Sequence, residues 1–489
     1  MIPFEKSGNG VVEPSRVLPL DGEYDVIVAG GGMAGCGAGI AAARAGCKTL
    51  IIERESALGG LATVGLVNIP LDFLSGIGAE MFRKLEEVKG LWHRNSDPEK
   101  NKLILDRMVR GAGCDVLFHT QVVEAIVKKG AICGVVVESK SGRQAILAKR
   151  VIDCSGDGDA AAMAGCDFAA GRPGDGYSQA CSLEFRLGGV DWDKYVNSEL
   201  KASDPRWTAT IAKALEAKDL PYEIENHLNW MTHVPGRPEH CGMDEVSICI
   251  CHSRKCKPLS NRDLTRMYFE GREQADTMWK FIRKHIPGFE KSWLIDTGAL
   301  LGVRDGRRIA GEYTMTAWDL ASGARFDDVV AISHHGYDIH HPTEPGNVKW
   351  VEMEIEGKKR PVICSAGGFN TSYFPEGGKA ALCDYKGRTG ADIKFPEPQF
   401  YDIPYRAMTP LKVENLLVAG RCISTTFEAQ SGTRLIMLCM AMGEAAGVAM
   451  GLSLKQGIAP RKVNRVEIQR AIIANGGDLG QSKRRIPGL

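Results

Sequence analysis

A glycine-rich turn near the start of the chain has the spacing of a phosphate-binding loop. Gly30, Gly32 and Gly35 form a G-x-G-x-x-G pattern in which Ala34 occupies the fifth position. The first glycine permits a tight turn, the second lets the backbone approach a pyrophosphate, and the third lets the following helix pack against the preceding strand. The N-terminus of that helix would offer free N–H groups to phosphate. A plain tight turn is the alternative interpretation.

A carboxylate follows this turn at the distance expected of a ribose ligand. Glu53 stands 18 residues beyond Gly35, at the end of the next apolar run. An acidic residue there accepts hydrogen bonds from ribose hydroxyls, whereas a 2′-phosphate would call for a basic residue. NADP is therefore disfavoured, while NAD and FAD both stay open. A second glycine pair, which includes Gly60, and the nearby Thr63 would let the chain pass along an extended cofactor.

Four of the chain's 11 histidines occur in one short segment, residues 333–342. Histidine titrates close to neutrality, so such a segment is the first place to look for a proton carrier. We select His334, His335 and His340 as candidates. Hydrogen-bonded structural histidines and a metal site are the alternatives, and two adjacent pairs without a helical H-E-x-x-H pattern give poor metal geometry.

Arginine and tyrosine side chains supply further candidates. Arg304 belongs to a run with Arg307 and Arg308 that could clamp a carboxylate or pair with nearby acids. Tyr405 and Arg406 precede an apolar strand, so they could lie at the mouth between two domains, where ligands often bind, or form a hinge. A thiol cluster around Cys249 and Cys256 fits no standard metal spacing and is better explained as a buried strand.

The elements around the glycine turn are those of a nucleotide-binding unit. Residues 24–29 and 49–52 are short apolar runs that predict buried strands, and the alanine-rich residues 36–45 predict a helix between them. This is the opening βαβ unit of a parallel sheet. Short alternating segments between residues 116 and 148 predict an antiparallel meander. The strand–helix rhythm returns at residues 415–420, and a long apolar helix is expected from about Thr433 to Leu452.

Composition limits the class of protein. The chain has 489 residues, of which 44% are hydrophobic, and 61 basic residues nearly balance 60 acidic ones. No overall charge favours nucleic acid or an anionic membrane surface. No uninterrupted apolar run reaches the ~18–20 residues of a membrane span, and the first residues lack an export signal, so we expect a cytoplasmic protein without a membrane partner. Its 15 cysteines suit reduced thiols better than a disulfide scaffold.

Four separated motifs occur in a familiar order along the chain. They are residues 25–35, residues 59–63, residues 151–159, and residues 414–424 with 442–447. Together they resemble the FAD-dependent oxidoreductase family, which is related to fumarate reductase-type and glutathione reductase-type flavoproteins. The resemblance implies FAD as the cofactor and places Gly156 and Asp157 at the same FAD site. No second fingerprint remains for a dedicated NAD(P)H domain.

The resemblance also assigns the C-terminal elements. It implies that Gly420 and Arg421 lie beside the ribityl-phosphate chain and that the helix start at Thr433 and Arg434 lies near the flavin pyrimidine ring. A cation or a helix N-terminus there would stabilise the negative charge of reduced flavin. Where the family often has a histidine before the final helix, this chain has residues 427–430, and Glu428 is a possible substitute. The candidate cofactor-binding residues are Gly30, Gly32, Ala34, Gly35, Glu53, Arg54, Gly60, Thr63, Val122, Gly156, Asp157, Gly420, Arg421, Thr433 and Arg434.

Element pattern and resemblance together predict an α/β fold. We expect an FAD/NAD(P)-binding Rossmann-like domain with a parallel sheet and a β-meander, plus an inserted α+β substrate domain. The predicted ranges are 1–165 for the first part of the FAD-binding domain, 166–384 for the substrate domain, and 385–489 for the second part and the C-terminal tail.

The expected activity is FAD-dependent hydride transfer with a small organic substrate. Tryptophans and histidines in the middle of the chain favour a polyol, sugar-like or ring-bearing substrate, whereas the arginines favour an unsaturated carboxylate, and the sequence leaves both open. Alternatives are a flavoprotein acting on tRNA or in an electron-transfer complex, and a cofactor-stabilised binding protein without turnover. The electron partner and homo-oligomerisation also stay open.

Overall fold

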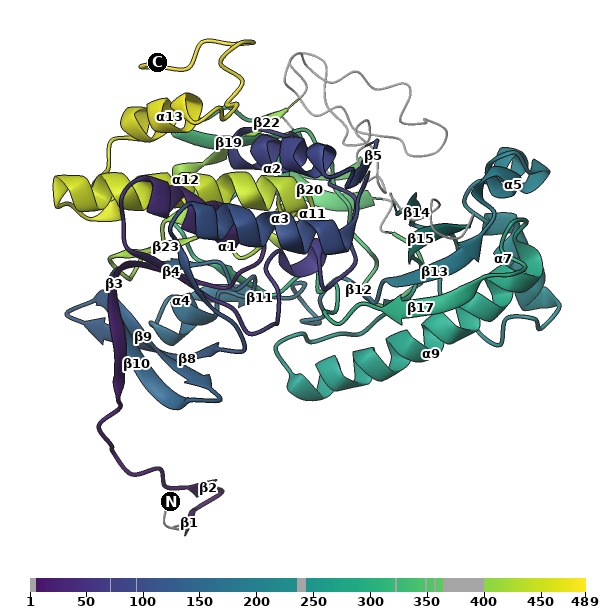
Figure 1. The fold of residues 1–489 in the computed structure, drawn as a ribbon, viewed down its shortest axis with the longest axis horizontal. Coiled ribbons are helices and arrows are strands. Elements are labelled where there is room, and N and C mark those ends of the chain that lie inside the picture. The colour runs from purple at the N-terminus through teal and green to yellow at the C-terminus, as the bar shows by residue number, and fades with distance from the viewer. Residues whose placement is uncertain are drawn as a thin grey trace.

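The computed structural model describes residues 6–489 except 71, 94, 235–242, 322, 348–349, 356–357 and 364–399. Within these residues the chain forms two lobes with separate hydrophobic cores (Figure 1). The predicted boundary between residues 384 and 385 lies outside the described residues, so the domain ranges stay a prediction.

A mixed sheet forms the centre of the larger lobe. Its parallel part contains β3 (Leu20–Ala29), flanked on one side by β4 (Thr49–Ile52) and then β7 (Asp115–Leu117), and on the other by β10 (Gly142–Asp153). The last residues of β10 also pair in parallel with β23 (Leu416–Val418), which comes from the C-terminal part of the chain. The predicted parallel sheet is therefore confirmed, and it contains strands far apart in sequence.

The predicted meander is also present. The first half of β10 pairs antiparallel with β9 (Ala131–Ser139), which pairs antiparallel with β8 (Gln121–Lys128). The long β10 thus joins the meander at one end to the nucleotide-type sheet at the other, which confirms the predicted α/β class.

Two helices pack closely on this sheet. α1 (Met33–Arg44) crosses α12 (Ile436–Gln456) through glycines: a Cβ on Gly37 would lie 2.3 Å from the Met440 carbonyl oxygen, and one on Gly443 would lie 1.9 Å from that of Ala34. The two backbones can approach only because these side chains are absent. By length and composition α12 could cross a membrane, but 83% of its apolar window is buried, as expected of a core helix.

The long helix begins later than the sequence predicts. The segment expected to enter it instead forms a separate short helix, α11 (Phe427–Thr433), and Leu435 is extended, with ψ 148°, before α12 starts. The Gly432 carbonyl accepts a hydrogen bond from the Tyr401 hydroxyl at 2.9 Å, in place of the next helical turn. Thr433 is therefore the end of a helix and not a helix start. The first helix, expected at residues 36–45, begins at Met33.

The second lobe has α+β character, as predicted for the inserted region. Its four-stranded antiparallel sheet has the order β14 (Trp230–His233), β15 (Asp244–Cys249), β13 (Phe185–Val190), β17 (Trp293–Thr297). The long helix α9 (Asn261–His285) packs against it and contributes to the second core (Figure 1).

The other elements are shorter or lie at the periphery. They are β1 (Lys6–Ser7), β2 (Gly10–Val11), η1 (Gly60–Ala62), α2 (Gly76–Glu87), β5 (Leu91–Trp92), β6 (Asn95–Ser96), α3 (Pro98–Gly111), α4 (Asp159–Met163), β11 (Phe168–Ala170), β12 (Cys181–Ser182), α5 (Trp192–Val196), α6 (Glu199–Ser203), α7 (Thr208–Glu216), β16 (His252–Ser253), β18 (Arg307–Ile309), α10 (Ala317–Ala321), β19 (Val329–Ser333), β20 (Trp350–Ile355), β21 (Lys358–Ile363), β22 (Tyr401–Pro404), η4 (Tyr405–Met408), η5 (Pro460–Lys462) and α13 (Arg465–Ala474).

The helix crossing gives a stability prediction. Gly443→Ala places a methyl group against the Ala34 carbonyl, so overpacking should lower the free energy of unfolding by about 1–3 kcal/mol. Gly78→Ala in α2 is the matched control, because its Cβ would meet Met437 and Met440 at ordinary contact distances of 3.6 and 3.7 Å. Urea denaturation of both variants tests this, and equal stabilities would contradict the crossing.

Candidate functional site

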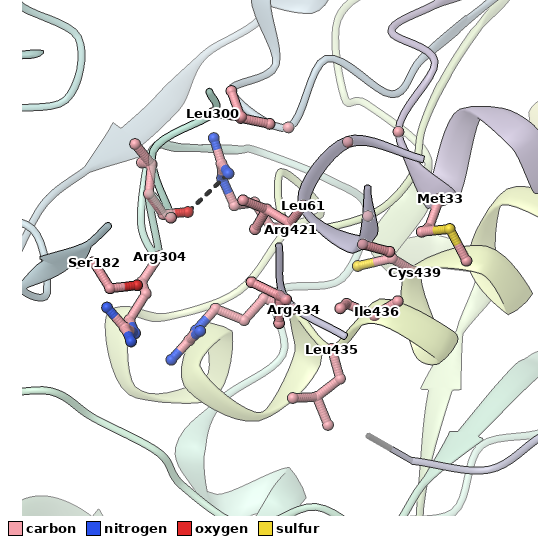
Figure 2. A pocket seen from close by; sticks show the side chains of 18 of the residues that line it. Met33, Leu61, Ser182, Leu300, Arg304, Arg421, Arg434, Leu435, Ile436 and Cys439 are labelled. Carbon is pink, nitrogen blue, oxygen red and sulfur yellow. Dashed lines mark hydrogen bonds between the residues drawn. The ribbon is translucent and has the colours of Figure 1, made fainter. Parts of the chain in front are cut away.

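A cavity of about 370 Å³ is lined by residues from many separate segments of the chain. Figure 2 shows Arg304, Arg421 and Arg434 around it, together with Met33 at the start of α1 and Ile436 at the start of α12. Thirteen of the residues that we predicted from the sequence line the cavity: Gly30, Gly32, Ala34, Glu53, Arg54, Gly60, Gly156, Arg304, His335, His340, Gly420, Arg421 and Arg434.

One end of the cavity is formed by the glycine turn between β3 and α1. Gly30 has φ +99°, and a Cβ there would lie 2.5 Å from the Cys154 carbonyl oxygen, so only glycine fits. Gly32 is the N-cap of α1 and provides no side-chain hydrogen bond, and a Cβ on it would meet no described atom within 4 Å. The first N–H groups of α1 therefore face open space. Gly35 does not line the cavity, but its missing side chain lets α1 approach the Gly30 carbonyl.

Glu53 lies beside this turn and is 7% exposed. Its Oε2 accepts a hydrogen bond from the Gly31 N–H at 2.6 Å, and its Oε1 accepts one from the Glu55 N–H at 2.8 Å. Each carboxylate oxygen has further lone pairs, so the oriented group can still accept from ribose hydroxyls. The second glycine pair is tied to the first turn, because the Gly59 N–H donates to the Gly31 carbonyl at 2.8 Å.

Arg421 reaches the cavity from the turn after β23. Its Nη2 donates to the Asp157 Oδ1 at 2.6 Å, and its Nη1 donates to the Val303 carbonyl at 2.8 Å. Figure 2 shows the Arg421 side chain among the residues that line the cavity. A Cβ on Gly156 would lie 3.3 Å from the guanidinium. Asp157 does not line the cavity and instead holds Arg421 in place.

These features fit an FAD dinucleotide. The uncapped helix N-terminus and the open space at Gly32 suit a pyrophosphate, and the oriented Glu53 carboxylate suits a ribose. When bound, FAD supplies hydride chemistry that no amino-acid side chain provides.

The opposite end of the cavity is rich in charge. Arg434 Nη2 donates to the Asp338 carbonyl at 2.9 Å and lies 3.5 Å from its carboxylate. Burial lowers the pKa of Arg434 to about 10 although Asp338 opposes this shift. The carboxylate of Asp338 also lies 3.4 Å from Nε2 of His340. Burial raises the pKa of Asp338, but His340 and Arg434 outweigh it and hold the pKa well below its ordinary value.

The histidine segment is divided between the cavity and the protein interior. His335 and His340 line the cavity, and the ring of His335 is fixed by a 2.8 Å contact between Nδ1 and the Gly336 carbonyl. Burial and then Arg304 lower the pKa of His340 to about 3, so this imidazole is neutral near pH 7. His334 lies outside the cavity lining, with its Nδ1 2.8 Å from Asp72 and its ring against Phe73.

Tyr405 and Arg406 do not line the cavity. The Tyr405 hydroxyl donates to the Pro460 carbonyl at 3.0 Å, and the Arg406 guanidinium pairs with Asp328 at 2.9 Å. Both side chains are thus committed to other partners, so neither enters the proposals below.

Three predicted cofactor residues also lie outside the lining. Thr63 donates from its hydroxyl to the Leu58 carbonyl at 2.6 Å, Val122 pairs with Val137 in the meander, and Thr433 is fully buried at the end of α11.

The thiol cluster does not form a metal site within the described part of the chain. Cys249 and Cys251 are buried, and burial raises both pKa values well above the ordinary thiol value. Cys241, which belongs to the same cluster in the sequence, lies outside the described residues.

Several residues of the charged end do not belong to any of the predicted sites. They are Ser182, Glu184, Arg206, Asn229, Trp230, Asp338 and Asn347. One signal was available for Glu184: Ser182, Glu184 and Arg186 alternate with apolar residues, which places them on one face of an extended segment.

Comparison with known proteins identifies the family. Residues 25–472 match the model of the FAD-dependent oxidoreductases. The chain belongs to this family. FAD is accordingly its cofactor, as the resemblance implied.

Individual relatives resemble parts of this flavoenzyme. It is 33% identical over 161 residues to a tRNA uridine 5-carboxymethylaminomethyl modification enzyme from Geotalea uraniireducens, which is 29% of this chain and 25% of the relative. It is 35% identical over 151 residues to a thiamine thiazole synthase from Methanococcus aeolicus, which is 27% of this chain and 55% of the relative. The chain thus spans about a quarter of the first of these curated relatives and about half of the second.

Among solved structures, a geranylgeranyl bacteriochlorophyll reductase-like protein from Thermoplasma acidophilum aligns with 93% of this chain and 87% of its own. The alignment has 15% identity and a TM-score of 0.43.

The glycine turn gives a cofactor prediction. Gly32→Ala should fold normally, since φ is −63° and the added methyl group meets only open space. The methyl group would occupy the space of the pyrophosphate, so the Kd for FAD should rise about ten-fold or more. A ten-fold rise corresponds to a loss of about 1.4 kcal/mol of binding free energy. Fluorescence titration of the apoprotein with FAD measures this, with Gly111→Ala at the exposed end of α3 as the control. An unchanged Kd would place the pyrophosphate elsewhere.

Proposed function

We propose that this FAD-dependent oxidoreductase transfers hydride between flavin and a small organic acid held at the charged end of the cavity. The observation that carries the proposal is Arg304, a buried arginine on the cavity wall that forms no salt bridge with any carboxylate of the described residues.

Arg304 is 8% exposed and makes contacts to neutral groups. Its Nη1 donates to the Ala180 carbonyl at 2.7 Å, and its Nη2 lies 3.2 Å from His252 Nε2 and 3.9 Å from the Cys249 sulfur. Burial lowers the pKa of His252 to about 4, so that imidazole is neutral near pH 7. No residue in the described ranges forms a salt bridge of 4 Å or less with Arg304. A buried cation of this kind is stabilised when a bound anion supplies the missing charge.

Two further guanidinium groups line the same end. Arg434 lies 3.5 Å from the Asp338 carboxylate and donates to the Asp338 carbonyl at 2.9 Å and to the Gln179 side-chain oxygen at 3.3 Å. Arg206 donates from Nε to the Leu228 carbonyl at 3.2 Å. Guanidinium groups bind carboxylates through two parallel hydrogen bonds, which fixes the orientation of the anion as well as its affinity. The three arginines outnumber Asp338 and Glu184, the acidic residues of the lining at this end, and this excess of positive charge favours an anionic substrate.

The aromatic residues give less support to a ring-bearing or sugar-like substrate. Trp230 lines the cavity, but Trp207 is fully buried in the second core and Trp293 packs over Gly188 and Gly189. Their abundance in the middle of the chain therefore serves packing more than recognition.

Arg304→Met tests the proposal. We expect the KM for the acid to rise about ten-fold or more, which corresponds to about 1.4 kcal/mol of binding. Bound FAD should be retained, and Arg304→Lys should recover part of the loss. Anaerobic mixing with sugars, polyols and unsaturated acids, followed by the absorbance of oxidised flavin, identifies the substrate class.

The matched control is Arg83→Met, which removes an exposed arginine of α2 and should leave KM unchanged. Bleaching by sugars alone would overturn the proposal. A change in FAD affinity without a change in KM would assign Arg304 to the flavin and not to the substrate.

A further inference from the structure

Glu184 is a buried carboxyl on the wall of the charged end. It lies between β12 and β13, is 2% exposed, and lines the cavity. Its Oε1 accepts a hydrogen bond from the Ser182 hydroxyl at 2.8 Å. Its Oε2 is buried without a hydrogen-bond partner among the described residues. A buried polar atom of this kind costs stability unless a ligand or a proton satisfies it.

The groups that face Glu184 act on its protonation. Burial raises the pKa of Glu184 to about 7, against the opposing effects of Arg304, the Ser182 hydrogen bond and the Cys249 thiol. Cys251 lies close enough to be influenced by Glu184, and both thiols stay protonated because burial raises their pKa values well above the ordinary value. Arg304 is therefore the charged group that acts on this carboxyl, which places the two at the same part of the cavity.

Other candidate proton carriers at this end are less suited. Burial and Arg304 hold the pKa of His340 near 3, so this imidazole is a weak base. His335 has one ring nitrogen committed to the Gly336 carbonyl. Cys249 stays a thiol. Glu184 is a carboxyl of the cavity lining with one oxygen held by Ser182 and the other without a hydrogen-bond partner among the described residues.

We infer that Glu184 exchanges the proton that accompanies hydride transfer, an inference that rests on the proposed function. When the substrate is oxidised, a C–H bond and the neighbouring O–H or C–H bond break, and a double bond forms between the two substrate atoms. With FAD bound, the hydride and its two electrons would pass to the flavin, and the proton would pass to the Glu184 carboxylate. In reduction the O–H bond of the Glu184 carboxyl would break and return that proton. Ser182 is a positioning residue that aims the carboxyl.

Glu184→Gln is the decisive variant, because it keeps the shape of the side chain and removes the exchangeable proton. We expect kcat to fall about 10²- to 10⁴-fold, the usual effect of losing a general acid or base. KM and FAD content should change little. The ionisation near pH 7 in the pH dependence of single-turnover flavin reduction should disappear. Glu87→Gln, at an exposed position in α2, is the matched control.

Infrared spectroscopy gives a readout that needs no substrate. A carboxyl C=O band that titrates near pH 7 should remain when the spectrum of Glu184→Gln is subtracted from that of the wild type, which removes the band of Glu444, whose pKa burial also raises to about 7. In Ser182→Ala the same titration should move to higher pH, because the lost hydroxyl stabilises the ionised form.

The outcomes separate this inference from the proposed function. A Gln variant that keeps its rate and pH profile, or a carboxyl band that does not titrate near neutrality, overturns the role of Glu184. The Arg304-dependent bleaching by an organic acid would then still stand. If no organic acid reacts, the proposed function is wrong and the assignment to Glu184 falls with it.

Discussion

The close parallel packing of α1 and α12 is the constraint on which the site depends. Three glycines, Gly37, Gly443 and Gly447, remove the side chains that would hold the two backbones apart. Gly443 packs against the backbone of Ala34, and Gly447, one turn later, packs against that of Ala38. Because the contacts advance along both helices together, the two helices run in the same direction. Both also begin at the cavity, where Met33 and Ile436 line its wall. Two helix N-termini therefore direct their positive ends at the same space, and negative charge is favoured there.

This packing also explains how segments that are far apart in the sequence come together in one site. β23 joins the sheet at the end of β10, and the following turn brings Arg421 to the cavity opposite the first glycine turn. The break between α11 and α12 then exposes Arg434 to the cavity, where an uninterrupted helix would have given its backbone a different course. Asp157 and Asp338 compensate Arg421 and Arg434, whereas Arg304 forms no salt bridge with a described residue and can meet a bound anion.

Local patterns predicted the glycine turn that forms one end of the cavity. The spacing of Gly30, Gly32 and Gly35 and the position of Glu53 follow from one continuous βαβ unit, whose geometry is set by neighbours in sequence. Prediction failed where tertiary contacts decide. The helix break after Thr433 depends on a hydrogen bond from Tyr401 to Gly432, and nothing near Tyr405 or Arg406 in the sequence shows that Pro460 and Asp328 bind them.

The proton carrier illustrates the same limit most clearly. A histidine cluster is conspicuous in a sequence because the free imidazole titrates near neutrality, yet burial drives the pKa of His340 down to about 3. The same burial drives the pKa of a carboxyl in the opposite direction, because in both groups it is the charged form that loses hydration. Nothing in the sequence distinguishes Glu184 from other acidic residues, yet burial raises the pKa of its carboxyl to about 7. In water a histidine titrates near neutrality and a glutamic acid does not, but in this cavity burial reverses the two. Only the folded structure shows that Glu184, and not His340, has a pKa near neutrality.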